Sequence, residues 1–315
     1  LVLSASAVSA GTWRFRGEND NFSLTELRFK VASASNEQLA VASVDLKDNG
    51  VVVQSKPLVL VGDDYVATFT GLNIPVGTEK VLTADVNTAD VTTTVTTGKN
   101  VGLTLDYVKY KSDSVSETTD NTDRTGSALY VHDAIPSLTQ TALSSGTFTT
   151  GFQDLARFTI TPSNGPGGSV AVNSIRFDIS KSSGVRLASA SASDLRLYIN
   201  GGDVTPASVS HSGLGQSSTS GYVIFEFPTE VVLSGATTVA FRGNVDLGDG
   251  TDTLTVSMHQ DTTKTGPADA ETAGASSASL VWSDRSASSH SNTTADWMDS
   301  YLLQGLPMSW GLSRN

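Results

Sequence analysis

The stretch Leu24–Val31 reads LTELRFKV, and Gln153–Ile160 reads QDLARFTI. In each stretch apolar and polar residues alternate around an Arg-Phe step, which is the pattern of a strand with one buried face. The two stretches lie in different halves of a chain of 315 residues, which exceeds the usual size of one hydrophobic core. We therefore predict that the halves are copies of one plan and that these two strands occupy equivalent positions.

Further segments recur in the same order in both halves. The tight turns Asp48-Asn49-Gly50 and Asn200-Gly201-Gly202 contain residues that accept a positive φ and are typical of hairpins. The matching strands are Glu37–Leu46 with Ser169–Phe177, Tyr65–Phe69 with Tyr222–Phe225, and Lys80–Val86 with Val239–Val245.

Short strands separated by turns, with almost no helical periodicity, predict an all-β protein of two tandem immunoglobulin-like antiparallel β-sandwich domains. We place the domains at residues 1–135 and 136–315, with the boundary at Pro136, because proline and its restricted predecessor form a rigid join. Lys111–Ser127 is expected to be a long loop of the first domain, and Ala128–Ile135 its last strand. Only Asp296–Leu306 has partial helical spacing, and strand or irregular structure fits it equally well.

The composition excludes several functions. The net charge is −12, the pI is about 4.6, and no Lys/Arg cluster offsets this field, so nucleic acid is not an expected partner. No apolar run approaches the roughly 20 residues of a membrane span. Cysteine is absent, which excludes disulfides, thiolate metal sites and a cysteine nucleophile.

Four framework phrases carry a resemblance to a known class of proteins. They are LNIPVGTEKVLTADV (Leu72–Val86), LARFTITPSN (Leu155–Asn164), SDLRLYINGG (Ser193–Gly202) and TADWMDSYLLQGLP (Thr294–Pro307). Over nearly its whole length the chain resembles secreted surface and appendage proteins of bacteria that are built from tandem immunoglobulin-like β-sandwiches. The resemblance implies a secreted, extracellular or cell-surface location and a role of adhesin, surface-layer or appendage type.

No catalytic residue is predicted. The Ser-rich stretches contain no G-x-S-x-G elbow, and the histidines show no metal-binding or nucleophile spacing. The four histidines are His132, His211, His259 and His290.

One acidic turn is a candidate metal site. Asp246–Asp252 reads DLGDGTD, so Asp246, Asp249 and Asp252 could offer hard oxygen ligands to calcium. The spacing departs from that of an EF-hand loop and no Glu closes it, so an ordinary acidic hairpin turn is the alternative. No other cofactor is expected.

The chain ends are the candidate contacts between copies. Leu1–Ala10 reads LVLSASAVSA, which fits either the remnant of a signal peptide or, as we favour, a first strand. That strand either belongs to its own sandwich or is donated to a neighbouring copy. The C-terminal segment is more apolar than a solvated tail requires. The predicted contact residues are Leu1, Val2, Leu3, Leu302, Leu303, Leu306 and Trp310.

These patterns predict a non-enzymatic extracellular structural protein, the repeating subunit of a filament or similar assembly joined through terminal strands. Copies of the chain itself are then its partners. The alternative is a carbohydrate-binding or adhesin module that binds surface glycans through exposed rings, since aromatic faces stack on sugars. Trp13, Trp282, Trp297 and Trp310 are the rings that strand alternation leaves unassigned.

Overall fold

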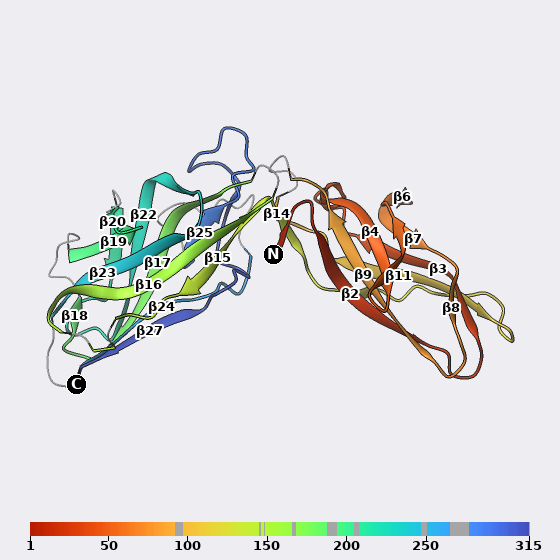
Figure 1. The fold of residues 1–315 in the computed structure, drawn as a ribbon, viewed down its shortest axis with the longest axis horizontal. Helices are drawn as coiled ribbons and strands as arrows, with labels where there is room; N and C mark the ends of the chain where they lie inside the picture. Colours follow the sequence, from red (N-terminus) through yellow and green to blue (C-terminus); the bar gives the residue numbers. More distant parts are fainter. Residues whose placement is uncertain are drawn as a thin grey trace. The chain divides into compact units, whose positions relative to one another are not determined.

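The computed structural model describes residues 1–91, 97–144, 146–147, 149–165, 168–187, 194–204, 208–246, 251–264 and 277–314. These residues form strands and one short 3-10 helix, η1 (Glu37–Ala40), which confirms the predicted all-β class. No helix in the described part of the chain is long and apolar enough to cross a membrane. The contacts separate two compact units, Leu1–Asp133 and Ala134–Asn315, which are described one at a time (Figure 1).

Unit 1 contains two antiparallel sheets and a small third one. Its strands are β1 (Val2–Leu3), β2 (Ala7–Arg16), β3 (Phe22–Val31), β4 (Val41–Asp48), β5 (Val51–Lys56), β6 (Val59–Val61), β7 (Asp64–Phe69), β8 (Leu72–Ile74), β9 (Glu79–Thr88), β10 (Lys99–Asn100), β11 (Leu103–Ser112), β12 (Thr118–Asp120), β13 (Arg124–Thr125) and β14 (Tyr130–His132). The first sheet has the order β2-β9-β4-β5, and the second has the order β12-β11-β3-β7-β6. In the third, β14 pairs with β10 and, in parallel, with β1.

The core of unit 1 lies between its two main sheets. Alternate residues of β3 point inward, so Leu27 and Phe29 are fully buried, and Leu46 and Leu82 meet them from the opposite sheet. Phe29 packs edge-to-face against Phe69 with ring centroids 5.9 Å apart. Burial of such side chains stabilises the sandwich by about 25 cal/mol per Å² of apolar surface.

Unit 2 is a second pair of antiparallel sheets. Its strands are β15 (Ala134–Gln140), β16 (Gly151–Asn164), β17 (Val170–Lys181), β18 (Arg186–Leu187), β19 (Leu195–Ile199), β20 (Gly202–Asp203), β21 (Ser208–Ser212), β22 (Ser220–Leu233), β23 (Thr237–Asp246), β24 (Thr253–Met258), β25 (Leu280–Ser283), β26 (Trp297–Met298) and β27 (Met308–Ser313). The sheets have the orders β15-β16-β23-β19-β20 and β21-β22-β17-β24-β27. Phe177 and Phe241 stack between them with centroids 4.8 Å apart.

The two units share one arrangement of eight strands. The order β2-β9-β4-β5 matches β16-β23-β19-β20, and β11-β3-β7-β6 matches β24-β17-β22-β21. Each first strand also has a bulge at the same place, between Ser9 and Gly11 in β2 and between Asp154 and Ala156 in β16.

Part of the predicted correspondence between the halves is wrong. Leu24–Val31 lies in β3, which pairs with β11 and β7, whereas Gln153–Ile160 lies in β16, which pairs with β15 and β23. These places differ, and the true counterpart of β3 is β17. Glu37–Leu46 likewise leads into β4, whose counterpart is β19 rather than the strand that contains Ser169–Phe177.

The later correspondences occupy matching places. Tyr65–Phe69 and Tyr222–Phe225 lie in β7 and β22, and the last predicted pair lies in β9 and β23. The two turns agree in backbone conformation as well, since Asn49 and Asn200 each have a φ of 50° and the glycines that follow have 80° and 81°.

Several local expectations differ from the structure. The expected loop Lys111–Ser127 contains the short strands β12 and β13, both of which pair with β11. Pro136 lies inside β15, where it pairs with Pro162 of unit 2. Within Asp296–Leu306 the chain forms β26 and turns, with no helix.

A buried lysine holds irregular segments of unit 2 together. Lys181, at the end of β17, is 4% exposed, and its Nζ donates to the carbonyl oxygens of Val185 and Gly215 at 2.7 Å each and to that of Ser218. Burial lowers the pKa of this ammonium group. The side chain therefore satisfies three carbonyl groups that would otherwise lack a donor.

We predict that Lys181→Met lowers the free energy of unfolding of unit 2 by at least about 2 kcal/mol, because each buried polar group that loses its partner costs about 1–3 kcal/mol. Chemical denaturation followed by tryptophan fluorescence measures this loss. Lys264→Met removes a half-buried lysine of the same unit and serves as the control. A Lys181→Met variant as stable as the parent would show that the three carbonyl contacts contribute nothing.

Candidate binding groove

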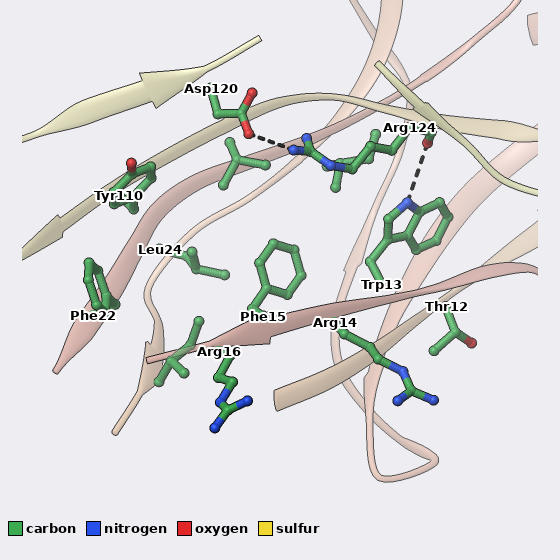
Figure 2. A pocket seen from close by; sticks show the side chains of 13 residues that line it. Thr12, Trp13, Arg14, Phe15, Arg16, Phe22, Leu24, Tyr110, Asp120 and Arg124 are labelled. Atoms are coloured by element: carbon green, nitrogen blue, oxygen red, sulfur yellow. Dashed lines mark hydrogen bonds and ion pairs between the residues drawn. The ribbon is translucent and has the colours of Figure 1, made fainter. Parts of the chain in front are cut away.

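A groove opens between the two sheets of unit 1. Its volume is about 490 Å³, and it is lined by β2 on one side and by residues of β3, β8 and β11 on the other. Figure 2 shows its lining side chains, among them the rings of Trp13, Phe15, Phe22 and Tyr110.

The alternation of β2 produces one wall of the groove. In the segment Thr-Trp-Arg-Phe-Arg, Trp13 and Phe15 face the space between the sheets, whereas Arg14 and Arg16 lie on the other side of the strand (Figure 2). Trp13 packs edge-to-face on Phe29, with ring centroids 4.7 Å apart. Its indole Nε1 also donates to a backbone carbonyl oxygen at 3.3 Å, so this ring is fixed in place.

The opposite wall is also aromatic, and a charged pair lies at the rim. Phe22 and Tyr110 pack edge-to-face with centroids 5.9 Å apart. At the rim, Arg124 lies 2.7 Å from Asp120. Hydrogen bonds from Thr122, together with Arg124, lower the pKa of Asp120 to about 2, so this carboxylate stays ionised at neutral pH.

The groove coincides with an uncovered strand edge. On one side β2 pairs with β9, and on the other side the carbonyl of Ala10 accepts a hydrogen bond from the Ser127 N–H at 2.7 Å. Beyond that point, from Thr12 to Arg16, no strand among the described residues pairs with the outer edge of β2. Unpaired N–H and C=O groups at such an edge are ready to pair with another chain.

Unit 2 shows what the uncovered place accommodates. With the two bulges aligned, Phe15 of β2 corresponds to Ile160 of β16. In unit 2, β15 runs antiparallel beside β16 and places Leu138 opposite Ile160, where Leu138 is 3% exposed. The groove of unit 1 therefore lies where unit 2 contains an additional strand.

The predicted calcium ligands are only partly described. Asp246 ends β23 and lies 2.8 Å from a guanidinium nitrogen of Arg186, while Asp252 is 1% exposed and accepts a hydrogen bond from Ser182 Oγ at 3.2 Å. Asp249 lies outside the described residues. Among those that are described, no three His, Asp or Glu side chains are grouped so that they could hold a metal ion.

The predicted contact residues at the chain ends pack within their own units. Val2 and Leu3 form β1 beside β14, and Leu1 is half-buried. Near the C-terminus Leu302 is 41% exposed, whereas Leu303, Leu306 and Trp310 are buried. Trp310 lies in β27, and its Nε1 donates to the Thr141 carbonyl at 3.0 Å. The core of unit 2 thus accounts for most of the apolar character of this segment.

The histidines lie in unlike surroundings. His211 is exposed on β21, and His132 is fully buried in β14. His259 has its Nδ1 2.7 Å from a carboxylate oxygen of Asp178 and 3.1 Å from a hydroxyl.

One constellation that sequence reasoning missed has the spacing of a catalytic triad. Ser283 Oγ lies 2.9 Å from His290 Nε2, and His290 Nδ1 lies 2.6 Å from Glu230 Oε2. However, Ser283 is fully buried, and its hydroxyl donates to Asp296 at 2.9 Å. A substrate cannot reach this oxygen without local opening, so we interpret the group as a buried network that fixes the loops around β25.

Comparisons with known proteins add three distant likenesses. No protein-family model matches the chain, and no curated protein matches it. The C-terminal domain of the Streptococcus agalactiae AgI/II polypeptide BspA is 9% identical, with 81% of this chain and 89% of that chain covered and a TM-score of 0.24. The C-terminal domain of the Streptococcus pyogenes antigen I/II-family protein AspA is 10% identical, with 81% and 89% covered and a TM-score of 0.22. The T6 backbone pilin of serotype M6 Streptococcus pyogenes is 10% identical, with 95% and 64% covered and a TM-score of 0.22. These values are too low to establish a shared fold or function.

We predict that Asp296→Asn destabilises unit 2 in a pH-dependent way. Burial opposes ionisation of Asp296, but hydrogen bonds from His290, Thr294 and the Ala287 N–H outweigh it and lower the pKa to about 2. Because the folded pKa is below the unfolded value, the stabilisation is complete above about pH 5 and is lost as the pH falls towards 2. The expected loss at pH 7 is about 2 kcal/mol.

Denaturation at several pH values measures the difference between Asp296→Asn and the parent, which should shrink below about pH 4. Asp246→Asn removes an exposed ion pair of the same unit and should cost under about 1 kcal/mol. A constant difference from pH 7 to pH 3 would contradict the assignment.

Proposed function

We propose that the chain is a non-enzymatic structural protein of the cell surface, and that its copies join into a homopolymer by adding a strand to the groove of unit 1. The observation that carries this proposal is the uncovered place beside β2, because the equivalent place in unit 2 is filled by β15. The extracellular location is supported by the sequence resemblance to secreted surface and appendage proteins.

Strand addition satisfies two demands at once. An incoming strand pairs with the N–H and C=O groups of Thr12–Arg16, and its inward side chains fill the space beside Phe15, as Leu138 does beside Ile160. The pairing supplies affinity, and the pockets between the rings determine the register. A contact between two different surfaces of the same molecule is head to tail, and its repetition yields an open filament when the rotation between copies does not close a ring.

The terminal strands β1 and β27 can join copies only if each leaves its partner in its own unit and pairs with the same partner in another copy. In the structure β1 pairs with β14, and β27 pairs with β24 inside unit 2. Removal of residues 302–315 would therefore take away Trp310 and Leu312, which are both buried, and expose the part of the core that they cover. Loss of assembly in such a deletion would not separate a lost joint from a lost fold.

The aromatic lining favours a second candidate function, a carbohydrate-binding or adhesin module. Sugar stacking requires an accessible ring face, whereas Trp13 is only 7% exposed and packs on Phe29. The groove is therefore better suited to backbone pairing than to stacking on a pyranose.

We predict that the parent protein forms concentration-dependent polymers and that Phe15→Asp remains a folded monomer, since the charge occupies the apolar wall beside the incoming strand. Negative-stain microscopy and multi-angle light scattering measure both. Phe152→Asp changes a 40%-exposed phenylalanine of β16 and should polymerise like the parent. A parent that stays monomeric at high concentration, or binds a glycan as a monomer, would contradict the homopolymer.

A further inference from the structure

Two strands of unit 1 expose an unusual amount of apolar surface. Six of the twelve large apolar side chains that are exposed in the described residues lie in β5 and β6. In β5, Val51, Val52 and Val53 are 67%, 46% and 43% exposed. In β6, Val59, Leu60 and Val61 are 57%, 55% and 45% exposed. Consecutive strand residues point to opposite faces, so both faces of each strand are open.

These two strands form the edge of unit 1 that lies opposite β2. β5 is the last strand of the sheet that begins with β2, and β6 is the last strand of the second sheet. Natural proteins usually protect such edges with short strands, charges or proline. Lys56 and Pro57 lie between the two exposed apolar runs, but neither run itself contains a charge or a proline.

The equivalent edge of unit 2 is polar. There β20 contains only Gly202 and Asp203, and β21 reads Ser-Val-Ser-His-Ser. Because the two units share one topology, the fold does not require an apolar edge, and the difference lies in the residues of the edge strands alone. Unit 2 protects the edge, and unit 1 leaves it apolar.

The two edges of unit 1 also differ in charge. Arg14 and Arg16 lie on the β2 edge with side chains 72% and 66% exposed, and their ion pairs with glutamates are long, at 3.6 and 4.0 Å. Asp63 and Asp64 follow β6 at the opposite edge, and both are exposed. Two exposed carboxylates therefore lie beside the apolar strands, and two exposed guanidinium groups lie along the β2 edge.

We propose that the β5–β6 edge of one copy docks against the β2 edge and groove of a second copy. The inference rests on the proposed homopolymer and names the surface that enters the groove. Since β2 and β5 are the two ends of one sheet, their pairing continues that sheet from copy to copy, and the valines of β5 cover the rings of the groove. The contact is head to tail and leaves one free edge of each kind at the two ends of the polymer.

Cysteine cross-linking tests the contact directly, because the chain contains no cysteine of its own. Arg14→Cys and Val52→Cys place single thiols on the two edges of the otherwise full-length protein. Treated with a short bismaleimide, a mixture of the two variants should yield a heterodimer that neither variant yields alone. The double variant should yield a ladder of linked multimers on a denaturing gel.

Leu39→Cys replaces Val52→Cys in the control, because Leu39 is 54% exposed and lies on neither edge.

Val52→Lys, with Leu39→Lys as its control, should abolish polymers while unit 1 stays folded. If the parent polymerises but the mixture gives no more heterodimer than the Leu39→Cys control, the edge contact is wrong and the homopolymer stands. If the parent is monomeric, both proposals fail.

Discussion

The constraint on which this structure depends is the pairing of strand edges. A sandwich buries its core between two sheets, but each outermost strand still presents N–H and C=O groups that need partners. In unit 2, β15 pairs with the edge of β16 and β27 pairs with the edge of β24, so the inner strands of that side are covered by the same chain. In unit 1, β12 and β13 pair with the edge of β11, whereas part of β2 and the outer edges of β5 and β6 have no partner strand among the described residues.

Polar groups in the interior of unit 2 fix segments that strand pairing does not reach. Lys181 ties turns near β18 and β22 to the end of β17 through three carbonyl oxygens. The network of Ser283, His290, Glu230 and Asp296 does the same for the loops around β25 and β26. Removal of one member leaves the others buried without a partner, which makes such groups costly to change even where they perform no chemistry.

The sequence was sufficient to predict the class of fold and two of the strand correspondences, because alternation and tight turns are local. The turn at Asn49 and its counterpart at Asn200 are recognisable since a left-handed backbone restricts the residues that fit. For the two earlier segments, in contrast, the sequence similarity indicates the wrong counterpart strand in unit 2. LTELRFKV and QDLARFTI are alike because each alternates around a buried phenylalanine, but alternation does not say which strand lies beside it.

The groove could not have been predicted in the same way. Strand alternation leaves Trp13 unassigned, and only the pairing of β15 with β16 shows that a neighbouring strand is missing beside Trp13 and Phe15. The apolar C-terminal segment was assigned to a contact between copies, although Leu303, Leu306 and Trp310 fill the core of unit 2. The exposed valines of β5 also form an apolar run, and such a run does not show from the sequence alone whether it lies in the core or at an open edge. Apolar sequence thus identifies what must be covered, and the order of strands in a sheet determines whether the cover comes from the same chain or has to come from another.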